Sequence, residues 1–215
     1  MNHAASAEII REYGPFPTGD VAGVSFDGAR VWFATGERIE ALDPDSGEIT
    51  GGVDVPADAG TAFDGTHLWQ IAEAVIRKVD PRTGAVLATI PAPGKGGDSG
   101  LTWAEGSLWV GEYRAASIHQ IDPATGKVLR TIKSDRFVTG VTWVDGELWH
   151  GTWQDDASDL RRIDPDSGKV LERLDMPEST GISGLESDGA GRFFAGGGQS
   201  GKVRAIRRPG HAAAA

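Results

Sequence analysis

An internal repeat of about 40 residues runs through most of this 215-residue chain. An Asp-Pro dipeptide with a glycine three residues after the proline begins at Asp43, Asp80, Asp122 and Asp164. An aromatic residue in a short apolar run precedes each dipeptide and recurs in a fifth place, at Trp32, Trp69, Trp109, Trp149 and Phe194. A glycine opens each of the units, at Gly23, Gly60, Gly100, Gly140 and Gly184. Three landmarks with one period predict five structural repeats that stack on one another.

Each unit reads as four short strands separated by turns. In the third unit we expect strands over residues 101–103, 108–112, 118–121 and 128–132. The turn before the last strand contains Pro123, which fixes φ, and Gly126, which admits the left-handed conformation. No window has a helical period of 3.6 residues. Four antiparallel strands per repeat of this length are typical of a β-propeller blade, so the fold class is predicted as all-β.

The two ends of the chain predict how the ring closes. The fifth unit has three strands and lacks a fourth, whereas Ile9–Tyr13 before the first unit resembles a fourth strand. We therefore predict a five-bladed propeller in which the N-terminal strand, at about residues 8–13, completes the last blade. This closure would remove an open sheet edge. Residues 1–210 would form a single propeller domain and residues 211–215 a flexible tail.

Charge and composition exclude several kinds of function. The formal net charge of −10 disfavours contact with nucleic acid and with anionic membrane surfaces. The chain has no cysteine, so it has neither a thiolate nucleophile nor a Cys-ligated metal. Residues 1–7 lack the pattern of a secretory signal, so we expect a cytoplasmic protein. We also expect a monomer that acts on a small molecule or a peptide.

The repeat unit, DG-x-x-L/V-W followed by I-D-P-x-[ST]-G-K/E-V-L, resembles that of a known propeller superfamily. This is the broad group of YVTN-like and virginiamycin B lyase-like propellers. The chain is also similar to the five-bladed glutaminyl cyclotransferases, which share the Asp-Pro-x-Thr-Gly turn. Both resemblances imply the propeller fold over almost the whole chain. The Thr-Gln-Gly-Leu and Asn-Glu-Leu-Glu segments that we associate with cyclotransferase activity do not occur in it.

Candidate site residues lie on the face that carries the inter-blade connections and the loops between second and third strands, here called the top face. These loops differ between blades, as expected of a functional surface on a repeating scaffold. In blade three, Glu112, Tyr113 and Arg114 place an acid, an amphipathic ring and a cation together. Trp153 lies outside the repeating aromatic column, and we expect it to cover a substrate. Asp98 and Arg136 belong to inter-blade loops that would also face a substrate.

Three further positions break the symmetry of the blades. Gln70 and His150 interrupt an apolar column of the second strands, and they either face a ligand or are satisfied between blades. Glu186 stands among the small residues that the other innermost strands carry, and it is either a general acid or base or a carboxylate bonded to nearby hydroxyls. We predict Glu112, His150 and Glu186 as catalytic. We expect His119 to lie on the blade surface, in a third-strand column with Glu40, Arg77, Arg161 and Arg204.

No cofactor is predicted, because no two histidines have the spacing of a transition-metal site. A calcium or magnesium ion held by Asp20, Asp58 or Asp98 is the remaining possibility.

Three hypotheses of function follow. The first is an acid–base enzyme of lyase or cyclotransferase type at the top of the axis, and the second is a non-catalytic propeller that binds a ligand or protein. The third is a divalent-metal-dependent lactonase, which needs three acidic loop residues that converge on one point.

Overall fold

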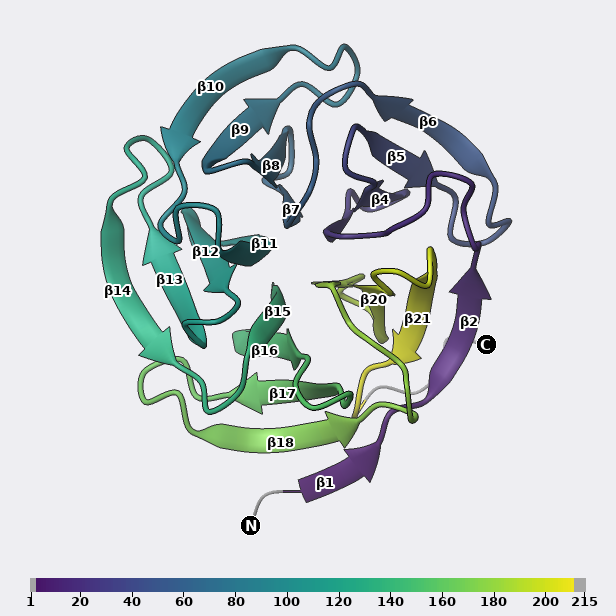
Figure 1. The fold of residues 1–215 in the computed structure, drawn as a ribbon, viewed down its shortest axis with the longest axis vertical. Coiled ribbons are helices and arrows are strands. Elements are labelled where there is room, and N and C mark those ends of the chain that lie inside the picture. Colours follow the sequence, from purple (N-terminus) through teal and green to yellow (C-terminus); the bar gives the residue numbers. More distant parts are fainter. Residues whose placement is uncertain (1–2, 211–215) are drawn as a thin grey trace.

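The computed structural model describes residues 3–210, which form a ring of five sheets around a central axis (Figure 1). Every regular element within this range is a β-strand. Accordingly, residues 3–210 contain no helix that could cross a membrane. The predicted all-β, five-bladed propeller is confirmed, and the tail expected at 211–215 lies outside the described residues.

In each blade the strands run from the axis outward in chain order. Blade one contains β3 (Val24–Phe26), β4 (Val31–Ala34), β5 (Ile39–Leu42) and β6 (Ile49–Val53). Blade two contains β7 (Thr61–Phe63), β8 (Leu68–Ala72), β9 (Val75–Val79) and β10 (Val86–Pro91). Blade three contains β11 (Asp98–Ala104), β12 (Ser107–Glu112), β13 (Ser117–Ile121) and β14 (Val128–Lys133). Blade four contains β15 (Val138–Val144), β16 (Glu147–Thr152), β17 (Asp159–Ile163) and β18 (Val170–Asp175). Blade five contains β19 (Gly184–Ser187), β20 (Arg192–Gly196) and β21 (Val203–Arg207), and β2 (Ile9–Tyr13) is its outermost strand.

The glycine that opens each repeat lies where the innermost strands meet. A Cβ atom on Gly60 would lie 2.5 Å from the backbone nitrogen of Leu101, and one on Gly100 would lie 2.6 Å from that of Val141. The same clash continues from Gly140 to blade five and from Gly184 back to blade one. The five backbones therefore contact one another in a closed ring, which no residue with a side chain would allow. We call Gly23, Gly60, Gly100, Gly140 and Gly184 the glycine ring.

The repeating tryptophans are core residues, as the repeat pattern predicts. Trp32, Trp109 and Trp149 are almost completely buried, and Trp109 stacks on Trp143 with ring centroids 5.1 Å apart. The Asp-Gly turn of the motif serves the same core. In blade two, Asp64 accepts a hydrogen bond of 2.9 Å from the Trp69 indole nitrogen, and Asp27 does the same for Trp32 in blade one at 2.8 Å.

The predicted closure is confirmed by the pairing of β2 with β21. The two strands are antiparallel, with Ile9 opposite Ile206 and Tyr13 opposite Val203. The Tyr13 hydroxyl donates a hydrogen bond of 2.7 Å to the carbonyl oxygen of Pro44 in blade one. The N-terminal strand thus joins the last blade to the first.

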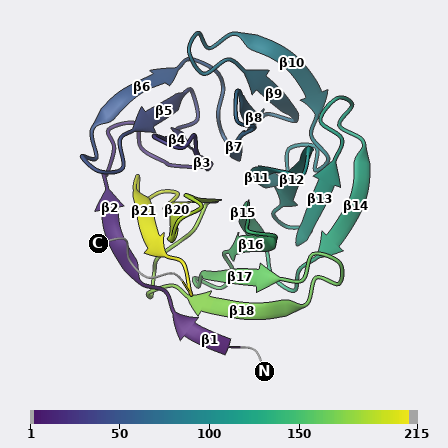
Figure 2. The same cartoon turned by 180° about the vertical axis from the view of Figure 1, so that it is seen from behind.

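A further strand at the N-terminus was not predicted. β1 (His3–Ser6) runs parallel to β18 and adds a fifth strand to blade four at the rim of the ring (Figures 1 and 2). The chain therefore contacts two blades before its first full repeat begins, with β1 on blade four and β2 on blade five.

Deleting residues 1–13 should destabilise the whole ring, because it removes β2 and exposes the edge of β21. We expect the melting temperature to fall by about 10 °C or more, since each kcal/mol is worth roughly 2–4 °C in a domain of this size. Deleting residues 1–6 removes only β1 and should cost clearly less. A 1–13 deletion that melts like the parent protein in a thermal scan would show that closure by β2 does not stabilise the ring.

Replacing Gly100 with alanine should lower the free energy of unfolding by about 1–3 kcal/mol or more, because the added methyl group overlaps the backbone of blade four. Gly51 in β6 provides the control, since a Cβ atom there meets nothing within 4 Å. Chemical denaturation of both variants measures the difference. If Gly51→Ala costs as much as Gly100→Ala, close backbone contact at the axis is not the cause.

Candidate functional site

The top face contains a cavity of about 860 Å³ at the axis. Its floor is formed by the residue that precedes each glycine of the ring, namely Ala22, Ala59, Ser99, Thr139 and Ser183. Its walls come from the second-to-third-strand loops and the inter-blade loops of blades two to five. A second hollow of about 450 Å³ shares Ala22, Asp58, Ser183 and Gly198 with the first and extends over blade one.

Two carboxylates of blade three lie side by side in the cavity wall. Asp98, the first residue of β11, is paired in register with Glu112, the last residue of β12. Asp98 is only 9% exposed, and one of its oxygens accepts a hydrogen bond of 2.8 Å from the backbone nitrogen of Gly94. Burial, together with the nearby charge of Glu112, raises the pKa of Asp98 above its ordinary value. A buried carboxyl group with a raised pKa beside a second carboxylate is a recognised arrangement for acid–base chemistry.

The loop before Asp98, which contains Gly94, Gly96 and Gly97, packs against these two carboxylates. A Cβ atom on Gly94 would lie 2.8 Å from an Asp98 oxygen and 2.9 Å from Cγ of Glu112, so a larger residue there would displace these side chains. The backbone nitrogen of Tyr113 donates to the carbonyl oxygen of Gly97 at 2.9 Å, which ties the loop to the end of β12. The glycines of this loop thus allow its backbone to enclose the pair.

His119 is a member of this cluster that the sequence analysis missed. Its Nε2 atom lies 3.0 Å from Oε2 of Glu112, and its side chain is only 12% exposed. The assignment of His119 to the blade surface was therefore wrong, because its ring turns toward the top loop. The third-strand column contained the signal, since Arg77 in blade two reaches the top-loop carboxylate of Glu73 at 2.7 Å in the same way.

Tyr113, Arg114 and Trp153 all line the cavity beside these acids. The Tyr113 hydroxyl donates to the carbonyl oxygen of Trp153 at 3.3 Å, which links the top loops of blades three and four. The Trp153 ring packs against Gly181, where a Cβ atom would lie 3.4 Å from it. Arg114 is exposed, and within residues 3–210 its guanidinium has no hydrogen-bond or ion-pair partner. The wall thus offers two aromatic rings and an unpaired cation next to two acids.

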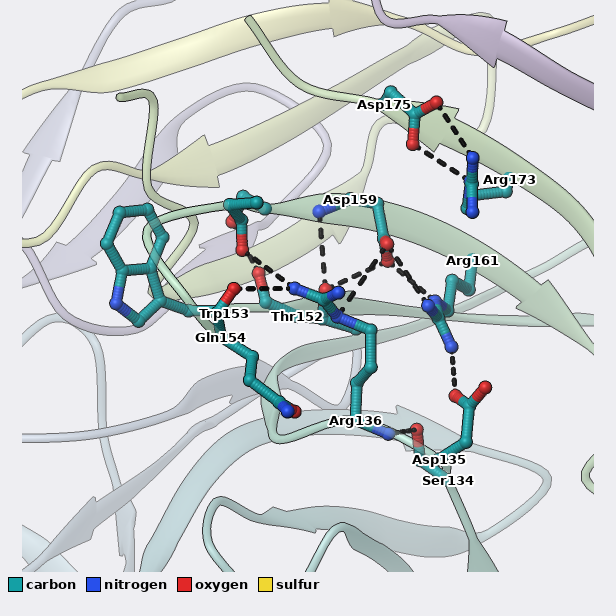
Figure 3. Close-up of polar contacts among 12 residues, drawn as sticks. Ser134, Asp135, Arg136, Thr152, Trp153, Gln154, Asp159, Arg161, Arg173 and Asp175 are labelled. Carbon is teal, nitrogen blue, oxygen red and sulfur yellow. Dashed lines mark hydrogen bonds and ion pairs between the residues drawn. The ribbon is translucent and has the colours of Figure 1, made fainter. Parts of the chain in front are cut away.

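Arg136 holds the top loop of blade four and does not line the cavity. Its guanidinium donates to the carbonyl oxygens of Gln154 at 2.8 Å and Ala157 at 3.1 Å (Figure 3). Beside it, Arg161 binds both carboxylate oxygens of Asp159, at 2.6 and 3.1 Å, and also pairs with Asp135. Figure 3 shows the Trp153 ring apart from this cluster. The cluster orders the loop that carries Trp153.

Gln70 and His150 are both completely buried, and neither lines the cavity. Gln70 accepts from Thr61 at 2.6 Å and donates to the carbonyl oxygens of Ala59 and Ile71 at 3.1 and 2.7 Å. Burial lowers the pKa of His150 to about 4, so the ring is neutral at physiological pH. Gln70 is thus satisfied inside its blade, whereas His150 has Nδ1 at 3.2 Å from the carbonyl oxygen of Gly151 and an Nε2 atom without a hydrogen-bond partner among residues 3–210.

Glu186 lies below the glycine ring and is also absent from the cavity lining. Its Oε1 atom accepts hydrogen bonds from the Thr142 hydroxyl at 2.5 Å and from the backbone nitrogen of Ser187 at 2.9 Å. Burial raises the pKa of Glu186 to about 7 despite these donors. Bonding to an axial hydroxyl is the second of the two readings that the sequence allowed.

Residues 3–210 contain no group of three His, Asp or Glu side chains placed to hold a metal ion. Asp58 and Asp98 both line the main cavity, and Asp20 lines only the smaller hollow. The convergence of three acidic loop residues, which a metal-dependent lactonase needs, is therefore missing from the described part of the chain.

Comparison with known proteins finds likeness in fold. No protein-family model and no curated protein matches the chain. Among solved structures, glutaminyl cyclase from Myxococcus xanthus is 18% identical with a TM-score of 0.79, over 96% of this chain and 98% of its own. Virginiamycin B lyase from Staphylococcus aureus is also 18% identical, with a TM-score of 0.54 over 92% of this chain and 69% of its own. The resemblance to these propellers is confirmed, and at this identity it extends to the fold alone.

The raised pKa of Glu186 should make stability depend on pH. Because the folded-state pKa of about 7 exceeds the ordinary value of 4.5, the folded protein binds this proton more tightly than the unfolded chain. The free energy of unfolding should then fall between about pH 5 and pH 7 by an amount on the order of 2 kcal/mol and level off above. Glu186→Gln should remove this decrease in denaturant titrations at pH 5 and pH 8. Equal pH dependence in parent and variant would contradict the assignment.

Proposed function

We propose that the protein is an enzyme of lyase or cyclotransferase type, which acts on a small molecule or the end of a peptide in the top cavity. The observation that carries this proposal is the adjacent pair Asp98 and Glu112, in which burial favours a proton on Asp98. The cavity volume of about 860 Å³ suits a ligand of this size, since such pockets typically measure roughly 300–1,000 Å³.

The chemistry of such reactions requires two proton transfers. In a cyclisation of an N-terminal glutaminyl residue, the α-amino nitrogen attacks the side-chain carboxamide carbon, a C–N bond forms, and the C–N bond to the amide nitrogen breaks with release of ammonia. A base must take a proton from the attacking amine, and an acid must give one to the leaving nitrogen. Glu112 and Asp98 can supply these two functions from one side of the cavity.

Other residues of the wall fit supporting roles. The carboxylates of Asp58 and Glu112 favour a substrate that carries an amino group. Arg114 would hold an anionic group or stabilise negative charge that develops on the substrate oxygen. Tyr113 and Trp153 would cover the apolar part of the substrate and exclude water.

Glutaminyl cyclisation is the reaction to test first, because the glutaminyl cyclase matches this chain over nearly its whole length. The motif segments expected of the cyclotransferases do not occur in this sequence. The proposal therefore rests on the cavity of this chain, and no residue role is transferred from the neighbour.

A second candidate is a non-catalytic propeller that binds a ligand with the same cavity. The unpaired Arg114 at the wall favours it, because a free guanidinium beside aromatic rings binds anionic or aromatic groups without any reaction. Under this alternative the protein would bind glutaminyl peptides or other small molecules but would not convert them.

Glu112→Gln and Asp98→Asn should each lower kcat by about 100-fold or more, the usual size of lost acid–base catalysis. The assay measures ammonia release from a peptide with an N-terminal glutamine. Both substitutions keep the shape of the side chain, so a loss of rate reports the loss of proton transfer.

Glu73→Gln is the matched control. Glu73 is also a top-loop carboxylate bound to a third-strand cation, but it does not line the cavity. It should keep the parent rate. Full activity in both the Glu112 and Asp98 variants would exclude this site, whereas binding of the peptide without ammonia release by the parent would establish the second candidate.

A further inference from the structure

We propose that His119 is a positioning residue, which holds the Glu112 carboxylate in its charged form and leaves the proton of the carboxylate pair on Asp98. The inference deepens the proposed function and rests on it for its catalytic meaning: Glu112 becomes the base and Asp98 the acid. The contact that carries it is the 3.0 Å approach of His119 Nε2 to Oε2 of Glu112.

The contacts of His119 are compatible with a ring in which Nε2 carries a proton toward Glu112. On its other side, Nδ1 lies 2.9 Å from the Thr131 hydroxyl, and Thr131 is the register partner of His119 on β14. In the neutral ring, Nδ1 accepts from Thr131 and Nε2 carries the proton toward Glu112. In the protonated ring both nitrogens donate. In either state Nε2–H donates to Glu112, which stabilises the carboxylate form.

Among residues 3–210, no side chain donates a hydrogen bond to Asp98. Its hydrogen bonds come from the neutral backbone nitrogens of Gly94 and Gly96, the second at 3.4 Å. It is more deeply buried than Glu112, whose side chain is 26% exposed. The two residues are adjacent in register, and the negative charge of Glu112 adds to burial in raising the pKa of Asp98. The asymmetry of partners and burial then places the proton of the pair on Asp98.

The other charged and titratable groups around the pair come from blade three and from the loops and strands of other blades that line the cavity. Lys133 on β14 reaches Ser117, the register partner of Glu112, at 2.7 Å. The cavity that Glu112 lines also contains Asp58, Asp98, Tyr113, Arg114 and Arg204, and His119 and Lys133 approach from the third and fourth strands of the blade. Of these, within residues 3–210, His119 alone has a side-chain hydrogen bond to the Glu112 carboxylate.

Carboxyl titration by ¹³C NMR tests the assignment without any substrate. In His119→Phe, the titration midpoint of Glu112 should rise and that of Asp98 should fall, each by about one pH unit, because the donor to Glu112 is lost. His119→Gln keeps an amide N–H near the position of Nε2, and its midpoints should stay close to those of the parent. His67→Phe, on the opposite face, is the control and should change neither.

Unchanged midpoints of Asp98 and Glu112 in a folded His119→Phe variant would overturn the proposal. So would a Gln variant that shifts as far as the Phe variant, since the effect would then come from packing. If the Phe variant does not fold, the titrations of the parent and of the Gln variant test the proposal. In both proteins Glu112 must then lose its proton at a lower pH than Asp98, and the reverse order would overturn the proposal. Because these measurements need no turnover, the inference can stand even if no ammonia is released from glutaminyl peptides, and it can fail while the enzyme proposal stands.

Discussion

The contact of five backbones at the axis is the constraint on which the rest of the structure depends. Each glycine of the ring lies against the innermost strand of the next blade, at distances that a Cβ atom would not permit. This contact fixes how closely the blades approach and closes the axis at that level. The residue before each glycine then forms the floor of a cavity. The glycine that opens each repeat thus sets the position of the candidate site.

The blades divide their tasks between two faces. On the bottom face the same local interactions recur, such as the carboxylate of Asp43, which accepts from the backbone nitrogens of Asp45 and Ser46 at 2.8 and 2.7 Å. The carboxylate at the start of such a turn satisfies backbone nitrogens within a few residues, and in blade one the same turn also accepts the hydrogen bond from the Tyr13 hydroxyl of blade five. The top loops are therefore free to differ. A polar side chain of the third strand contacts an acidic residue near the top loop in several blades. Arg77 binds Glu73 in blade two, His119 contacts Glu112 in blade three, and Arg161 binds Asp159 in blade four.

The repeat made the fold, the blade count and the closure by β2 predictable, because each depends on spacing and on local turn chemistry. The strand β1 was not predictable, since its pairing with β18 depends on an edge that only the assembled ring presents. Within the site, the sequence identified Asp98, Glu112, Tyr113, Arg114 and Trp153, which all line the cavity. It missed His119 because the side chain lies on β13 and contacts Glu112 at the end of the neighbouring strand β12, and this contact does not follow from the spacing of residues in the sequence. It gave Gln70 and His150 as candidates because they are polar residues in an otherwise apolar column of the second strands. Such a substitution does not show whether the side chain faces the cavity or the interior of the blade, and neither residue lines the cavity.

The two carboxyl groups with raised pKa show why access must be considered together with burial. Asp98 and Glu186 are both deprived of water, and in both burial outweighs the hydrogen bonds that favour the charged form. Only Asp98 opens onto the cavity, whereas Glu186 lies on the other side of the glycine ring and bonds to Thr142 of the neighbouring blade. The same physical effect therefore occurs at two places in one molecule. Above the ring the raised pKa belongs to a carboxyl group that lines the cavity, and below the ring to one that is bonded to a hydroxyl of the neighbouring blade.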